Sequence, residues 1–199
     1  MKTSAFVQQA SANAFGRRSR EVFARMAQIR GSANLGSSLE AGGARLDGRM
    51  DMTWVTGRIA VGGGIWNGDN MATVSRAGVT HIIDMQIEFD DTPLAEPHGI
   101  EVLWNPIDDD FQPKPAAVFQ RGVDFAIEAL DQPGTKLYIH CAAGVHRAPM
   151  MALALLCALG WKLSDALRLI ETRRPQADFA DVYVQSVERF LPGYAASRK

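Results

Sequence analysis

The sequence predicts an α/β fold in which helices flank a central, mainly parallel sheet, preceded by an N-terminal extension. Short β-branched runs alternate with amphipathic segments between residues 54 and 191, and such alternation is typical of a parallel sheet covered on both faces. The chain has 199 residues, of which 47% are hydrophobic and 22% charged. That composition excludes a wholly disordered chain, and the length is typical of one domain with an extension.

The elements are expected in the following order. β-Branched and apolar residues predict strands over 58–61, 79–84, 100–104 and 136–140. Helical spacing predicts helices over 71–77, 116–130, 148–159, 163–172 and 183–190. Gly78 is expected to close the first helix and Ser164 to cap the fourth. Trp104, in a strand, is expected in the core, and Arg173 with Arg174 is expected to form a solvated helix end rather than a substrate clamp.

Residues 1–50 differ from the remainder in charge. They hold eight basic and three acidic side chains, a net charge of +5, whereas the rest carries −6. Spacing of apolar residues favours a helix over 5–29, and the Gly- and Ser-rich stretch 31–48 indicates a flexible linker. We therefore expect a basic extension, helical or disordered, over 1–50 and the folded domain over 51–199. An N-terminal segment poor in acidic residues and rich in Arg, Ser and Ala is also typical of an organelle transit peptide, and the helix could instead bind a partner.

Composition excludes several classes of protein. The net charge of −1 gives no argument for binding nucleic acid or an anionic membrane. The longest apolar run, 148–161, contains Pro149 and Gly160 and is too short to span a bilayer. Two cysteines, Cys141 and Cys157, are too few for a disulfide scaffold. We expect a reducing, cytoplasmic compartment, with Cys157 in the core and Cys141 free to react.

The segment His140-Cys-Ala-Ala-Gly-Val-His-Arg147 carries the chemistry. Cys141 ends a predicted strand and Arg147 opens a predicted helix, so the loop falls where open α/β sheets bind ligands. The backbone N–H groups of the intervening residues can cradle a tetrahedral dianion, aided by the positive end of the helix. These phosphate-binding residues are Ala142, Ala143, Gly144, Val145 and His146. Arg147 offers a planar fork to phosphate oxygens, and the same field favours the thiolate of Cys141 as nucleophile.

A second group must protonate the leaving oxygen. The strand 100–104 leads into three carboxylates, Asp108, Asp109 and Asp110, and any of them could act as general acid and then as base for the attacking water. Clustering raises the pKa of carboxyl groups and so helps to keep one protonated. Phe111, just beyond the acids, is expected to line the pocket.

Residues 54–191 resemble the cysteine-dependent protein tyrosine phosphatase superfamily, in its dual-specificity branch. The resemblance lies in Gly78-Val-Thr-His-Ile-Ile-Asp84, in Pro106-Ile-Asp-Asp109 and in the loop from His140 to Arg147. It implies a phosphomonoester hydrolase that works through a phosphocysteine, with Cys141 as nucleophile and no cofactor or metal. The Pro-Ile/Val-x-Asp pattern of the family places the general acid on Asp109, with Asp110 as the alternative.

One position departs from the family. Most members have Ser or Thr after the arginine, whereas this chain has Ala148-Pro149, which is similar to the plant glucan phosphatases of the branch. The departure predicts slow hydrolysis of the phosphocysteine. A phosphoprotein (Tyr or Ser/Thr) or a phosphoglucan is the expected substrate.

Other functions are less well supported by the residues. A non-catalytic phosphate-binding adaptor would need Cys141 or the acid to be missing or misplaced. Rhodanese-type sulfurtransferases usually have four residues before the arginine, and this loop has five; arsenate reductases need resolving cysteines close by. Gly62 and Gly64 could begin a Gly-x-Gly-x-x-Gly dinucleotide-binding pattern, but Asn67 stands where its third glycine should be. The four scattered histidines do not predict a metal site.

Overall fold

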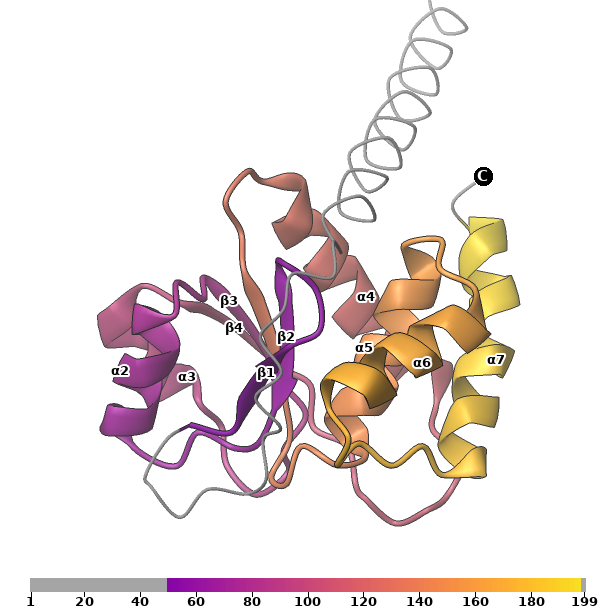
Figure 1. Cartoon of the computed structure of the whole chain (residues 1–199), viewed down its shortest axis with the longest axis horizontal. Helices are drawn as coiled ribbons and strands as arrows, with labels where there is room; N and C mark the ends of the chain where they lie inside the picture. Colours follow the sequence, from indigo (N-terminus) through magenta and orange to yellow (C-terminus); the bar gives the residue numbers. More distant parts are fainter. Residues whose placement is uncertain (1–49, 198–199) are drawn as a thin grey trace, which may run out of the picture.

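The computed structural model describes residues 50–197, which contain one mainly parallel sheet, as predicted (Figure 1). The order of the strands is β1-β2-β5-β3-β4. They are β1 (Met52–Trp54), β2 (Ile59–Gly62), β3 (His81–Asp84), β4 (Glu101–Trp104) and β5 (Leu137–His140). Only β1 runs antiparallel to its neighbour. The predicted extension 1–50 lies outside the described residues, apart from Met50.

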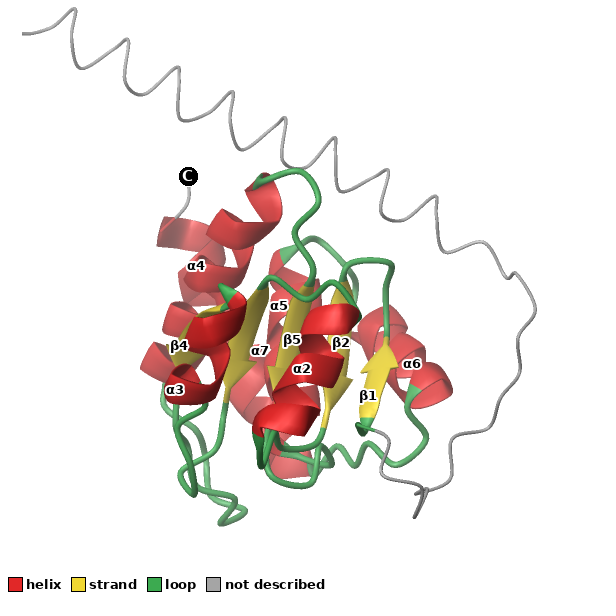
Figure 2. Ribbon diagram, turned by 90° about the vertical axis from the view of Figure 1, so that its left-hand side faces the viewer, coloured by secondary structure: helices red, strands yellow, loops and turns green. Residues whose placement is uncertain are grey.

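Helices cover both faces of this sheet (Figure 2). One face carries α2 (Gly68–Arg76) and α3 (Thr92–Ala95), followed by a short 3₁₀ turn at Glu96–His98. The other face carries the larger layer of helices: α4 (Ala116–Asp131), α5 (Arg147–Ala158), α6 (Leu163–Arg173) and α7 (Asp181–Ser197). None of the helices in residues 50–197 is long and apolar enough to cross a membrane.

Helix α5 lies at the centre of the larger layer. Ten of its twelve residues are buried, since it packs between strand β5 and the helices α4, α6 and α7. All four residues of β5 are buried as well. Cys157, expected in the core, packs against the buried side chains around α5 but is only partly buried itself. This partial burial raises the pKa of its thiol to about 11. The strand and helix that flank Cys141 and Arg147 are therefore the most enclosed part of the domain.

Two local predictions were wrong. Trp104 is 45% exposed, because β4 lies at the edge of the sheet, and its indole N–H donates to the carbonyl of Gln86 at 2.8 Å. Helix α6 begins at Leu163 with Lys162 at the N-cap position, so that Ser164 lies inside the first turn and does not cap it.

Candidate active site

The loop between β5 and α5 lies at the carboxyl edge of the sheet. Because β2, β5, β3 and β4 are parallel, their carboxyl ends meet at this edge. Cys141 follows β5 directly and is 1% exposed, and Arg147 is the first residue of α5. The positive end of a twelve-residue helix therefore opens at this loop, where it favours a bound anion.

The backbone of this loop has its carbonyl groups tied to the surrounding protein. The carbonyl of Ala142 accepts from the N–H of Gly64, that of Val145 from the N–H of Asp178, and that of His146 from helix α5. Within residues 50–197, no hydrogen bond uses the N–H groups of residues 142–146. Five N–H groups in a row are thus left for a ligand, which is what a cradle for a tetrahedral anion requires.

Arg174 buttresses the loop from behind, and the prediction of a solvated Arg174 was wrong. Its side chain is fully buried, and its Nε donates to the carbonyl of Gly144 at 2.8 Å. The same guanidinium pairs with the Asp51 carboxylate at 2.6 and 2.9 Å and reaches the Thr53 hydroxyl at 3.2 Å. Gly144 has φ +66°, and a Cβ there would collide with Arg174 and with the backbone of Gly62, so that only glycine fits.

Arg147 is 3% exposed and is oriented by Glu88 from the loop after β3. Its two terminal nitrogens donate to the Glu88 carboxylate at 2.9 and 3.0 Å, and one also reaches the carbonyl of Ile107. Burial is the largest influence on the pKa of Arg147 and acts to lower it, but the hydrogen bonds to Glu88 and the nearby negative charges of Cys141, Glu88 and Asp109 together raise it. The hydrogen bonds to Arg147 lower the pKa of Glu88 in turn. The Nε of Arg147 has no hydrogen-bond partner among the described residues, which leaves that edge of the fork for a phosphate oxygen.

Asp109 is the acid that the structure brings to this arginine. One oxygen of its carboxylate accepts from the Tyr183 hydroxyl at 2.8 Å. The other lies 3.0 Å from Nδ1 of His146 and 3.8 Å from the Nε of Arg147. Burial, followed by the hydrogen bond to Asp109, raises the pKa of Tyr183 to about 12. This tyrosine therefore stays a proton donor at every physiological pH.

The neighbouring carboxylates point elsewhere. Asp110 forms an ion pair with Lys114, and that bond lowers the pKa of Asp110, which makes it a poor general acid. Asp108 is exposed, and its carboxylate accepts from the N–H of Asp109. Of these three carboxylates, only Asp109 contacts Arg147 among the described residues.

Residues 105–115, between β4 and α4, form the acid loop, in which Phe111 has a left-handed backbone, at φ +55°. Its N–H donates to the Tyr183 hydroxyl at 2.9 Å, its ring stacks on Tyr183 at 5.7 Å, and it is 50% exposed. Lys114 is anchored one turn further along α7, through its N–H and the Ser186 hydroxyl. Helix α7 therefore holds the acid loop at two points.

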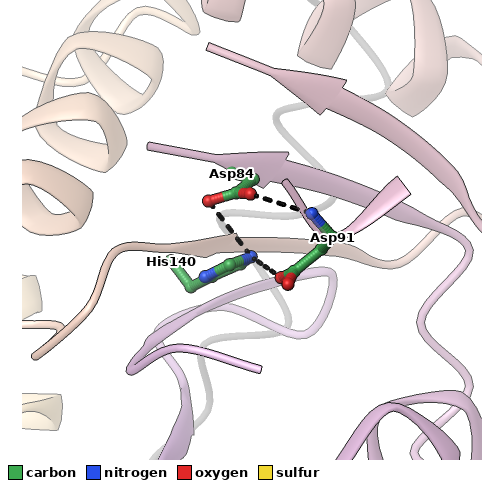
Figure 3. Close-up of side chains that lie close together, drawn as sticks. All are labelled: Asp84, Asp91 and His140. Atoms are coloured by element: carbon green, nitrogen blue, oxygen red, sulfur yellow. Dashed lines mark hydrogen bonds and ion pairs between the residues drawn. The ribbon is translucent and has the colours of Figure 1, made fainter. Parts of the chain in front are cut away.

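His140, directly before Cys141, lies in a buried cluster with Asp84 and Asp91 (Figure 3). Its Nε2 is 2.9 Å from an Asp91 oxygen and 3.8 Å from an Asp84 oxygen. The two oxygens of Asp84 accept the N–H groups of Gln86 and Asp91. Burial raises the pKa of Asp84 to about 6, although His140 opposes the shift.

This cluster was not foreseen from the sequence, which showed only scattered histidines. Its donors are types that metal ions bind, and they lie within 4.8 Å of one another. Both Asp84 oxygens accept backbone N–H groups, and His140 contacts Asp91, which ties the end of strand β5 to the loop after β3. Both ring nitrogens of His140 and both Asp91 oxygens are nevertheless buried without a hydrogen-bond partner among the described residues.

Four residues at the site were missed by sequence analysis: Glu88, Arg174, Asp178 and Tyr183. A signal existed for Glu88, because it follows a predicted parallel strand at the edge where Cys141 lies. Of the other three, Arg174 and Asp178 lie in the segment between α6 and α7, and Tyr183 lies in α7. Nothing in their local sequence marks them, since their partners are 30 to 123 residues away.

Several known proteins of one family are similar to this chain in sequence or in fold. Residues 66–189 match the family model "Dual specificity phosphatase, catalytic domain". The chain is 31% identical to human protein tyrosine phosphatase type IVA 3 over 103 residues, which are 51% of this chain and 58% of that protein. It is 32% identical to rat dual specificity protein phosphatase 26 over 119 residues, 56% of each chain. The match thus spans little more than half the length of these relatives.

Solved structures with the same fold include that of PTPMT1 in complex with PI(5)P. The TM-score is 0.65 at 20% identity, and the match covers 73% of this chain and 97% of that one. The family model spans more than half of the chain, from the loop before α2 to helix α7. By this match, the chain belongs to the dual specificity phosphatase family through its catalytic domain.

Proposed function

We propose that this domain hydrolyses phosphomonoesters through a phosphocysteine at Cys141. The observation that carries the proposal is the convergence of the unpaired N–H groups of residues 142–146, the free Nε of Arg147 and the Asp109 carboxyl at one loop. These are a cradle for three phosphoryl oxygens, a cation for the transition state and an acid for the leaving group.

Two steps follow from this arrangement. The Cys141 thiolate attacks phosphorus, the ester P–O bond breaks, and the leaving oxygen takes the proton of Asp109. A water then attacks the phosphocysteine, gives a proton to the Asp109 carboxylate and releases phosphate and the thiolate. Ala148 has no hydroxyl to assist the departing thiolate. We therefore expect a rapid burst of product followed by slower turnover.

The surface around the loop favours an aromatic phosphoester, hence phosphotyrosine, over the other substrates. Ile87 and Phe89 flank Glu88, and Phe111 lies in the acid loop. The indole of Trp104 donates to the carbonyl of Gln86, next to Ile87. Trp66 lies against Gly64, whose N–H donates to the carbonyl of Ala142 in the phosphate-binding loop. The exposed large hydrophobic side chains of residues 50–197 are these five: Trp66, Ile87, Phe89, Trp104 and Phe111. Aromatic rings of this kind suit the ring of a phosphotyrosine.

Charge argues against polyphosphorylated ligands. The loop has no Lys or Arg besides Arg147, and the carboxylates of Glu88 and Asp178 border the site, since they contact Arg147 and His146. A phosphoinositide, the ligand in the PTPMT1 structure, would meet these carboxylates without further basic partners. A phosphoglucan, favoured by Arg147-Ala-Pro149 alone, remains the rival substrate.

Phosphate release from a phosphotyrosine peptide, phosphorylated amylopectin and PI(5)P, measured side by side, tests the proposal. Cys141→Ser serves as the blank. The peptide is expected to give the highest kcat/KM. A higher value for amylopectin or PI(5)P would overturn the substrate but not the chemistry. Equal rates for Cys141→Ser and the wild type would overturn the chemistry. A protein that binds the peptide without releasing phosphate would be an adaptor.

A further inference from the structure

The imidazole of His146 bridges two carboxylates. Its Nδ1 lies 3.0 Å from Asp109, and its Nε2 lies 3.4 Å from Asp178. The ring is held edge-on against Phe111, with centroids 5.0 Å apart, and is one-fifth exposed. Asp178 is fixed in turn, because its own N–H donates to the carbonyl of Val145 at 2.9 Å. The three side chains therefore form a line with His146, from the phosphate-binding loop, at its centre.

Both ring nitrogens thus have a partner that can share a proton. When Asp109 carries the proton, it can donate to the lone pair of Nδ1, while Nε2–H faces Asp178. When Asp109 is ionised, an imidazolium can donate to both carboxylates. Passing between these forms moves one proton across the 3.0 Å contact and needs no other donor. Asp109 and His146 can therefore share one proton between them.

We propose that His146 is a positioning residue that stores the proton of the general acid, an inference that rests on the function proposed above. The other charged or titratable groups facing the pair are Asp178, Arg147 and Tyr183. Arg147 and Tyr183 stabilise the Asp109 carboxylate, and Asp178 stabilises the imidazolium. All three favour keeping the shared proton on the ring while Asp109 is ionised. The ring thus keeps a proton within reach of Asp109, which a carboxylate without this neighbour would not have.

The pH dependence of kcat/KM tests this with a poor leaving group, phenyl phosphate. His146→Asn keeps a hydrogen-bonding group beside Asp109 but cannot titrate, and His146→Ala removes both properties. We expect the alkaline limb of the profile to move down by about one pH unit or more in His146→Asn, with a loss of about tenfold at pH 7. Para-nitrophenyl phosphate should lose less, because its leaving group needs little protonation.

Two controls separate the possible failures. Asp178→Asn should shift the limb in the same direction by a smaller amount. NMR titration of the His146 ring should show its pKa falling when Asp109→Asn removes the carboxylate, a readout independent of turnover. Superimposable pH profiles for wild type and His146→Asn, or an unchanged ring titration, would overturn the inference. Undiminished activity in Cys141→Ser would instead overturn the proposed function.

Discussion

Arg174 is the residue whose loss most directly tests how the loop is held. Arg174→Met retains the apolar stem and removes the guanidinium. The carbonyl of Gly144 would then lose a charge-assisted hydrogen bond of 2.8 Å, and Asp51 would lose two. A buried acceptor left without a partner costs about 1–3 kcal/mol. The Asp51 side chain is half exposed, so water offsets most of its loss, to which we assign about 1 kcal/mol.

The expected loss of stability is therefore about 2–4 kcal/mol, which corresponds to a fall in Tm of about 4–16 °C in a chain of this size. Arg173→Met is the matched control: the same change at the adjacent, exposed position, where an effect within about 0.5 kcal/mol is expected. Thermal melts followed by circular dichroism measure both. Equal Tm values for the two variants would refute the view that Arg174 pins the loop.

Three further predictions concern the general acid, the partner of Arg147 and the buried Asp84. Asp109→Asn should lower kcat/KM for phenyl phosphate by about 100-fold or more. Asp110→Asn breaks only an ion pair with Lys114, so its kcat/KM should stay within about twofold of the wild type. Similar losses in both variants would contradict the assignment of the acid. Glu88→Gln weakens the pairing that orients Arg147 and should reduce kcat/KM about tenfold, chiefly through a higher KM for phosphate-bearing substrates. An unchanged KM in steady-state kinetics would show that Arg147 needs no partner. Because burial raises the pKa of Asp84 from 3.8 to about 6, folding takes up a proton, so the stability from this group is present below about pH 4 and is lost as the pH rises through 6. The Tm of Asp84→Asn relative to wild type should therefore rise between pH 4 and pH 7, and a constant difference would contradict the shift.

The sequence predicted those parts of the fold and site that depend on local pattern. The four parallel strands and the larger helices followed from periodicity. The position of Cys141 and Arg147 at the two ends of one loop could be anticipated, because strand, loop and helix are contiguous in the sequence. Asp109 could be placed near them because strands β4 and β5 belong to the same parallel sheet.

The remainder depends on packing between distant segments. Trp104 looks like a core residue until the strand order places β4 at the edge. Arg174 looks like a solvated charge, because its partners Asp51 and Gly144 are 123 and 30 residues away. The line from Asp178 to His146 likewise joins segments 32 residues apart. Such contacts arise from tertiary structure, which local propensity does not encode.

The central claim is that Cys141 forms the covalent intermediate. Mixing the protein with a phosphotyrosine peptide, quenching in acid within the burst and mapping the modified peptide by mass spectrometry tests it directly. We predict one phosphoryl group on the proteolytic fragment that contains Cys141 and none in Cys141→Ser. In Asp109→Asn, loaded with para-nitrophenyl phosphate because its leaving group needs little protonation, this phosphoryl group should last longer. Phosphate released at the wild-type rate by Cys141→Ser, or a phosphoryl group on any other residue, would contradict the account.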